Sequence, residues 1–329
     1  MKDFNLKEII GLIRRTAPFL IFRFAIYMGV TAAFVLATGT GAGLGYGIGK
    51  IAGNEAAGSG WGGLIGFGIA GAALVFFREY LLYLVKAGHI AVLVELMDGK
   101  DIPQGRSQIE HGRKVVRERF VESSVLFGLD QLIKGILRAF NRTFFTIASF
   151  LPLPGVKGLV KFANTVLTLS LTYLDEVILA YNIRTRSENP WQSSRTALIL
   201  YAQNYKTFLR NAVWLALMIW GLVFLVFLAV LGPLVLLVGL IPALAGPLTL
   251  VLALIFAWGV KEALIEPVAM TALMQVFFKA TEGQEPNPEW EEKLDRVSGK
   301  FNELKRKASD WATGRPAPDS AVSHPTPPN

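Results

Sequence analysis

The chain has 329 residues, of which 52% are hydrophobic and only 18% are charged, and its mean hydropathy is +0.43. Because soluble domains carry about 25% charged residues, this composition argues against an ordinary soluble domain and indicates a membrane protein. The chain has no cysteine, which excludes disulfides and thiolate metal ligands, and its three histidines are far apart in sequence, so we predict no metal site. The formal net charge of +8 comes largely from basic residues beside apolar stretches, so we interpret it as a topology signal and expect no nucleic-acid partner.

The N-terminal segment, residues 1–16, is amphipathic, and Asn5 and Glu8 have the spacing of a helix capping box. A first membrane span follows over residues 17–37. Arg23 lies in the first turns of this span, where we expect its long side chain to reach the cytoplasmic interface.

The stretch GTGAGLGYGIGK, residues 39–50, is rich in glycine and ends on a lysine. It fits neither the dinucleotide-binding fingerprint nor the Walker phosphate loop in any register. Its glycines do recur every four residues, which is the spacing that lets two apolar helices approach closely in lipid. A second glycine-rich span runs over residues 61–85 and would supply the partner helix. We therefore predict a close helix hairpin with these glycines at the contact: Gly39, Gly43, Gly47, Gly62 and Gly66.

Residues 121–142 have one apolar face and one charged face, which predicts an amphipathic helix. Asp130 precedes Lys134 by four residues, a favourable ion-pair spacing on a helix. We expect this charged face to meet water or lipid headgroups, with a polar wall inside a helix bundle as the alternative. A further apolar segment over residues 160–181 carries Asp175 and Glu176, and we interpret residues 121–181 as two membrane passages.

Residues 211–260 contain no charged residue, and as one helix they would be about 75 Å long, against a hydrocarbon core of about 30 Å. The segment GLIPALAGP, residues 239–247, supplies a turn, so we predict a helical hairpin. The second arm continues into Lys261, Glu262 and Glu266. Either this helix leaves the bilayer there, or these charges form a polar site between helices.

Basic residues are distributed asymmetrically along the chain. Seven lie in residues 86–119 and seven in residues 279–307, but only one lies in residues 38–60 and none in 239–247. By the positive-inside rule, both termini are predicted to be cytoplasmic, which requires an even number of passages, and six fits.

A helix is predicted to begin after Asn287, and an apolar heptad stripe continues over residues 290–311. We expect the stripe to pack on the protein's own cytoplasmic loops or to lie on the membrane surface. Self-association or a partner helix is the alternative. Residues 313–329 are rich in proline and are predicted to be disordered.

The order of features over residues 121–307 resembles the C-terminal half of choline transporter-like proteins. The segments concerned are LIKGILRAFNR, SSRTALILYAQNYKTFLRNA with the hydrophobic hairpin after it, and the last span running into VFFKATEGQEPNPEW. The chain is shorter than members of that family and lacks their cysteines and large extracellular loop. The resemblance implies an all-helical membrane protein that handles a small organic cation or a related lipid-like molecule.

We therefore predict an all-α, polytopic helical membrane protein of the cell inner membrane. It would comprise a transmembrane domain over residues 17–278, a cytoplasmic amphipathic helix over 279–312 and a bilayer partner that includes anionic lipids. The predicted function is movement of a small solute or lipid-like molecule, and the alternative is a membrane scaffold built on the glycine helices and the C-terminal stripe. No enzyme motif is present, and we predict no cofactor. The residues predicted to line a polar pathway are Asp130, Lys134, Asp175, Glu176, Lys261, Glu262 and Glu266.

Overall fold

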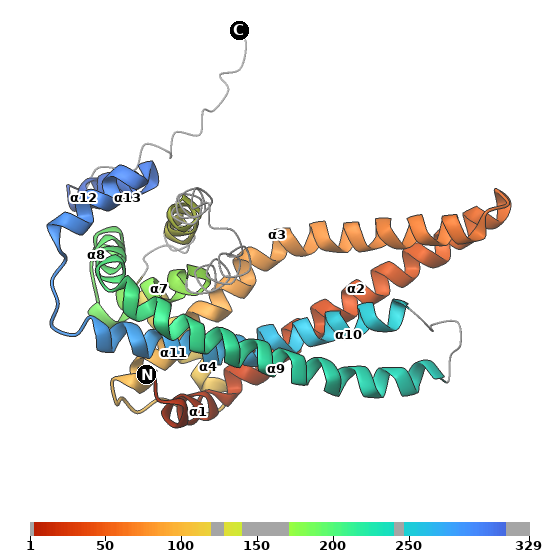
Figure 1. The fold of residues 1–329 in the computed structure, drawn as a ribbon, viewed down its shortest axis with the longest axis horizontal. Helices are drawn as coiled ribbons and strands as arrows, with labels where there is room; N and C mark the ends of the chain where they lie inside the picture. The colour runs from red at the N-terminus through yellow and green to blue at the C-terminus, as the bar shows by residue number, and fades with distance from the viewer. Residues whose placement is uncertain (1–2, 120–127, 140–170, 240–246, 314–329) are drawn as a thin grey trace, which may run out of the picture. The chain divides into compact units, whose positions relative to one another are not determined.

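The computed structural model describes residues 3–119, 128–139, 171–239 and 247–313. All regular secondary structure in these ranges is helical (Figure 1). The helices are α1 (Leu6–Arg15), α2 (Ala17–Ile51), α3 (Glu55–Met97), α4 (Arg106–Arg119), a helix over 128–139, α7 (Leu174–Thr185), α8 (Pro190–Gln203), α9 (Tyr205–Gly239), α10 (Pro247–Val260), the π-helix η2 (Lys261–Ile265), α11 (Glu266–Ala280), α12 (Pro288–Val297) and α13 (Gly299–Ala312). The prediction of an all-α protein is confirmed for the described residues.

The chain divides into two compact units. The first, which we call the hairpin unit, consists of Asn5–Lys114 and Trp214–Ala272. The second, which we call the C-terminal unit, consists of Met1–Phe4, Val115–Val213 and Leu273–Asn329.

The helix α1 begins where the sequence predicted it. The side chain of Asn5 accepts hydrogen bonds from the backbone N–H groups of Lys7 and Glu8, at 3.1 and 3.4 Å, and so satisfies two donors of the first turn. Ile9 and Leu12 are buried on its inner face. The predicted cap and amphipathic character are therefore confirmed.

The helix α2 does not end at residue 37. It continues through the glycine run to Ile51, turns at residues 52–54, and returns as α3 (Figure 1). The turn uses Gly53 in a left-handed conformation (φ +74°). Asn54 then caps α3 by accepting a hydrogen bond from the N–H of Ala57 at 3.2 Å. The glycine run is thus part of a helical hairpin of α2 and α3, which pack along each other.

Glycines hold the two helices of this hairpin backbone to backbone. A Cβ atom placed on Gly41 would lie 2.2 Å from the carbonyl oxygen of Gly62, and one on Gly45 would lie 2.0 Å from that of Gly58. A Cβ atom on Gly66 would lie 2.1 Å from the carbonyl oxygen of Ala37. Any side chain here would force the helices apart, so the prediction that Gly62 and Gly66 lie at the contact is confirmed.

The register predicted for α2 is wrong. A Cβ atom on Gly39, Gly43 or Gly47 would meet no atom of the described residues within 4 Å. The run contains two sets of glycines at four-residue spacing, offset by two residues, and two residues correspond to roughly 200° around a helix. The two sets therefore lie on opposite faces, and the set of Gly41, Gly45 and Gly49 is the one that faces α3.

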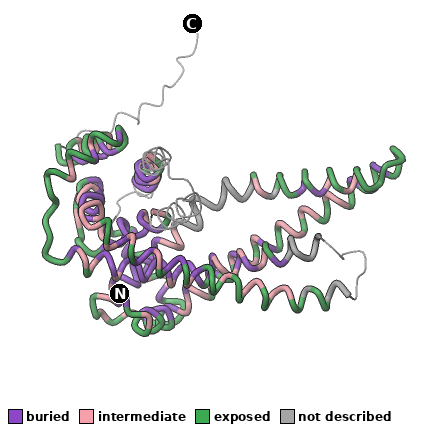
Figure 2. The backbone as a smooth tube through the Cα atoms, viewed as in Figure 1, coloured by how far each residue is buried: buried purple, intermediate pink, exposed green. Residues whose placement is uncertain are grey.

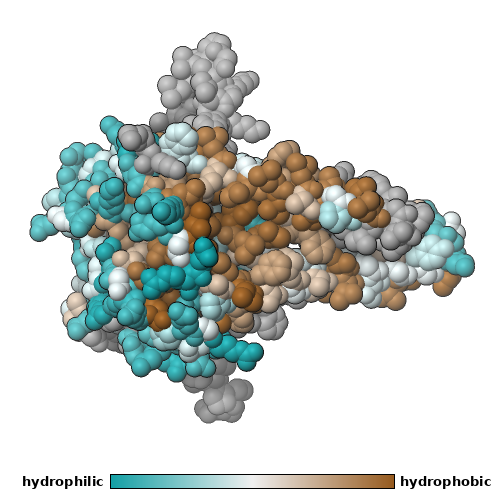
Figure 3. Space-filling view, turned by 90° about the horizontal axis from the view of Figure 1, so that it is seen from below, coloured by the Kyte–Doolittle hydropathy of each residue, from teal (hydrophilic) through white to brown (hydrophobic). Residues whose placement is uncertain are grey.

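Three helical stretches are long and apolar enough to cross a membrane within the described residues: Ala17–Ile51, Tyr205–Pro233 and Ala253–Ala280. They expose large apolar side chains, such as Leu36, Leu44, Trp220 and Leu225. Figure 2 marks exposed residues along the backbone in green. Figure 3 shows many brown, hydrophobic residues on the face that it draws. The chain is thus a helical protein with membrane-spanning candidates. The stretch predicted over residues 61–85 falls in α3, whose side chains are described only in part.

The predicted hairpin over residues 211–260 corresponds to α9 and α10. The helix α9 contains Pro233, and its last residue, Gly239, is the first residue of the predicted turn. The helix α10 begins at Pro247, and the residues between them lie outside the described ranges, as do residues 140–170, which hold most of the predicted passage before Asp175.

The C-terminal region forms two helices rather than the single predicted one. Ser298 has an extended backbone conformation, ends α12, and caps α13 by accepting a hydrogen bond from the N–H of Phe301. The stripe residues Leu294, Phe301 and Leu304 are buried, and α12 and α13 pack on α8 within the C-terminal unit. The heptad pattern therefore reflects intramolecular packing on two short helices. The predicted tail lies outside the described residues from residue 314 onward.

Candidate functional site: a buried ion-pair cluster

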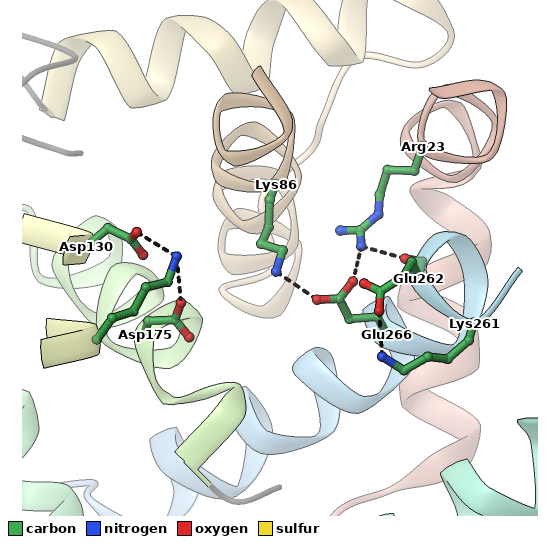
Figure 4. A network of polar contacts seen from close by, with 8 residues as sticks. Arg23, Lys86, Asp130, Asp175, Lys261, Glu262 and Glu266 are labelled. Atoms are coloured by element: carbon green, nitrogen blue, oxygen red, sulfur yellow. Dashed lines mark hydrogen bonds and ion pairs between the residues drawn. The ribbon is translucent and has the colours of Figure 1, made fainter. Parts of the chain in front are cut away.

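A buried carboxylate joins two helices of the hairpin unit to the start of α11. Glu266, which is 5% exposed, forms ion pairs of 2.7 Å with Arg23 of α2 and 2.7 Å with Lys86 of α3. Figure 4 shows its two oxygens directed at these two cations. Because each oxygen has its own cationic partner, the carboxylate is stabilised in its charged form inside an apolar set of helices.

The π-helix η2 creates an additional acceptor for Arg23. The backbone N–H of Glu266 donates to the carbonyl of Lys261, five residues back, instead of to Glu262. The carbonyl oxygen of Glu262 is released from the usual helical bond and accepts a 2.7 Å hydrogen bond from Nη2 of Arg23. The next residue, Pro267, has no N–H to donate. This single π turn therefore lets one guanidinium nitrogen bind both a main-chain carbonyl and a carboxylate.

A third ion pair lies in the π turn itself. Lys261 contacts the carboxylate of Glu262 at 2.6 Å. Tyr27 of α2 and Trp258 of α10 meet edge to face close by, with ring centroids 5.9 Å apart. We call Arg23, Lys86, Lys261, Glu262 and Glu266 the hairpin cluster, and it contains three cations and two anions.

Arg23 is buried rather than extended to the interface, which corrects the expectation from its position in the sequence. Its side chain is 2% exposed. Its Nε and Nη1 atoms are buried and have no hydrogen-bond partner in the described part of the chain. Buried donors of this kind cost free energy unless a polar group or water meets them. The hairpin cluster therefore contains two guanidinium donors that are buried without a partner among the described residues.

The other predicted polar residues form a separate group in the C-terminal unit. Lys134, on the helix over 128–139, pairs with Asp130 at 2.7 Å and with Asp175 of α7 at 3.8 Å. Asp130 and Glu176 are each 4% exposed. The expectation that the charged face carrying Asp130 meets water or headgroups is wrong for this residue, because it is buried next to α7.

The seven residues predicted to line one pathway are thus divided between two groups, each within one unit. Sequence reasoning found the acids of the hairpin cluster but missed its cations Arg23 and Lys86. One signal was available, because Arg23 is the only charged residue from Ala17 to Gly49, and such a residue needs a partner. Lys86 carried no comparable signal.

The described residues contain no group of three or more His, Asp or Glu side chains placed to hold a metal ion. The ion-pair partners of Glu262 and Glu266 are the cationic side chains of Arg23, Lys86 and Lys261. The chemistry available at the hairpin cluster is therefore ion pairing and hydrogen-bond donation.

Comparisons of the chain with protein families, with characterised proteins and with solved structures find no match.

Proposed function

We propose that this protein is a multi-pass membrane protein, with both termini in the cytoplasm, that moves a small solute or lipid-like molecule bearing an anionic group. The observation that carries the proposal is Arg23, a buried cation next to the carboxylate of Glu266, with two donors that no described residue meets. A guest anion would bind these donors and compete with Glu266 for Arg23 and Lys86. Ionisable residues inside membrane helices are functional-site candidates by default.

The scaffold alternative has less support from the packing. It depended on two surfaces, the glycine face and the C-terminal heptad stripe. The glycine row that includes Gly41 and Gly45 is filled by α3, and much of the stripe is covered by α8. These two contacts stabilise the chain's own fold, whereas a Cβ atom on the opposite row, Gly39, Gly43 and Gly47, would meet no described atom within 4 Å.

A vesicle experiment tests both forms of movement. The purified protein would be reconstituted with trace NBD-labelled phosphatidylglycerol or with an encapsulated water-soluble NBD dye, and dithionite, a small dianion, would be added outside. Bleaching beyond the outer leaflet reports lipid movement, and bleaching of the dye reports entry of the anion. We expect the wild-type protein to support one of these processes.

The informative variant is Arg23→Lys, with Arg296→Lys on the exposed surface of α12 as the matched control. Lysine keeps the charge opposite Glu266 but removes the spare guanidinium donors. If each donor contributes about 1 kcal/mol, the rate should fall about tenfold or more in Arg23→Lys and should not change in the control. Failure of the wild-type protein to move either probe, or equal rates for Arg23→Lys and wild type, would overturn the proposal.

A further inference from the structure

A second site lies at the base of α2, and its lining contains no residue of the hairpin cluster. A pocket of about 640 Å³ is formed within the hairpin unit by the end of α1, the start of α2, the end of α3 and the start of α4. Its lining includes two cations, two amides and apolar side chains, among them Arg14, Arg15, Gln104, Gln108, Pro18 and Leu96. Its volume is within the range of small-molecule sites, roughly 300–1,000 Å³.

The amide of Gln108, a lining residue of the pocket, has one oxygen that accepts no hydrogen bond from the described residues. The residue is 2% exposed, and its Nε2 donates to the carbonyls of Arg15 at 3.0 Å and Pro103 at 3.4 Å. These two acceptors fix the orientation of the amide, because the opposite orientation would place its oxygen against two carbonyl oxygens. Its Oε1 is therefore a buried acceptor, and no donor in the described residues meets it.

The two arginines of the pocket supply cationic hydrogen-bond donors. Arg14 and Arg15 are exposed, and guanidinium groups bind phosphate oxygens with good geometry. A ligand that satisfies all three side chains has an anionic phosphate next to a hydroxyl or ammonium donor. The buried Leu96 beside them suits a short apolar portion of the same ligand.

The position of the pocket indicates the source of the phosphate. Ala17 and Pro18 are the first residues of a helix that is long and apolar enough to cross the membrane, so we place the pocket on the headgroup side of that candidate span. The amphipathic α1, with Ile10 exposed, directly precedes it.

We infer that this pocket binds the headgroup of a phospholipid whose phosphate contacts Arg14 and Arg15 and whose headgroup hydroxyl or ammonium group donates to Gln108. The inference does not depend on the proposed function, since a bound lipid at this site would stabilise α1 against α2 whether or not the protein moves a solute.

The test uses the full-length protein in detergent and measures the shift in its thermal unfolding midpoint during lipid titrations. The probes are dihexanoyl phosphatidylglycerol and dihexanoyl phosphatidylmethanol, which carry the same charge but differ in headgroup hydroxyls, together with sn-glycerol 3-phosphate, which lacks acyl chains. We expect phosphatidylglycerol to bind about fivefold more tightly than phosphatidylmethanol, the effect of one net hydrogen bond. Glycerol 3-phosphate should bind much more weakly than either lipid.

Two variants separate the contributions. Arg14→Gln should weaken both lipids while leaving the lipid-free unfolding midpoint unchanged, because the side chain is exposed. Lys7→Gln, an exposed cation of the same helix that does not line the pocket, is the control and should bind both lipids as wild type does. In Gln108→Met, the preference for phosphatidylglycerol should disappear.

Three results would overturn the inference. Equal affinities of the wild-type protein for the two lipids would remove the role of Gln108. Equal losses in Lys7→Gln and Arg14→Gln would indicate general electrostatic attraction rather than a site. Glycerol 3-phosphate binding as tightly as phosphatidylglycerol would assign the pocket to a soluble phosphate ester.

Discussion

The two helices of the α2–α3 hairpin are held together by different interactions at its two ends. Near the turn, α2 and α3 approach through glycines, with Gly41 and Gly45 against the backbone of the other helix. At the base, Arg23 and Lys86 are joined through the carboxylate of Glu266. Lipid provides no hydrophobic driving force for helix association, so close packing and polar contacts must supply it. The hairpin uses one of these means at each end.

The largest expected effect is at the base of the hairpin. In Glu266→Leu, Arg23 and Lys86 lose their shared partner, and breaking a buried ion pair costs about 3–5 kcal/mol. The variant should lower the free energy of unfolding by this amount in detergent, measured by denaturant titration with circular dichroism. Glu55→Leu, an exposed acid in the first turn of α3, is the control for loss of one carboxylate.

If Glu266→Leu were as stable as wild type, the base of the hairpin would be held by packing alone and the contrast between its two ends would disappear.

A smaller effect is expected at the glycine contact. Gly45→Ala would place a methyl group 2.0 Å from the carbonyl oxygen of Gly58, and overpacking of this kind costs about 1–3 kcal/mol. Gly43→Ala is a matched control two residues away, where the methyl group meets no described atom within 4 Å. Because alanine favours helix over glycine by up to about 1 kcal/mol, the control should be neutral or stabilising. Thermal unfolding of the two variants side by side measures the difference, and equal stabilities would contradict the assigned register.

The smallest effect is expected at an ion pair outside the candidate membrane spans, which contrasts with the buried ion pairs at the base of the hairpin. Glu291 of α12 pairs with Arg195 of α8 and, at 3.2 Å, with Lys305 of α13. Burial acts to raise the pKa of Glu291, but the hydrogen bonds from Arg195 and Lys305 outweigh it, so its pKa lies below the ordinary value of 4.5. The contribution of this contact to stability is therefore fully present above pH 4.5 and is lost as the pH falls through the lowered pKa.

Because the contact is partly solvated, it should contribute only about 0.2–1 kcal/mol. The protection factors of the α12 amides, which correct for the intrinsic pH dependence of hydrogen exchange, should fall slightly on acidification in the wild-type protein. In Glu291→Gln they should already be lowered and should be insensitive to this titration. An acid-induced change of the same size in both proteins would assign it to another group.

Local signals in the sequence were sufficient for much of the fold. The cap at Asn5, the start of α12 after Asn287, and the glycine contacts at Gly62 and Gly66 each follow from short-range spacing. The glycine register of α2 did not, because two equivalent rows of glycines lie on opposite faces and only the partner helix selects one.

The candidate site was harder to predict because its contacts join residues far apart in sequence. Glu266 stands out by its position in an apolar stretch, but its partners Arg23 and Lys86 are 243 and 180 residues away. The break at Ser298 was also hidden, because an apolar stripe can continue across two short helices that pack on the same surface, here α8.

The length of the first hairpin sets how it meets a bilayer. As a helix of 35 residues, α2 is about 52 Å long. Even at a tilt of about 40°, the upper end of the usual range, it would extend about 40 Å along the membrane normal, which exceeds a hydrocarbon core of about 30 Å. Tilting alone cannot remove this hydrophobic mismatch. Part of the hairpin must project into the headgroups or beyond, so bilayers of different thickness would enclose different lengths of the same rigid pair of helices.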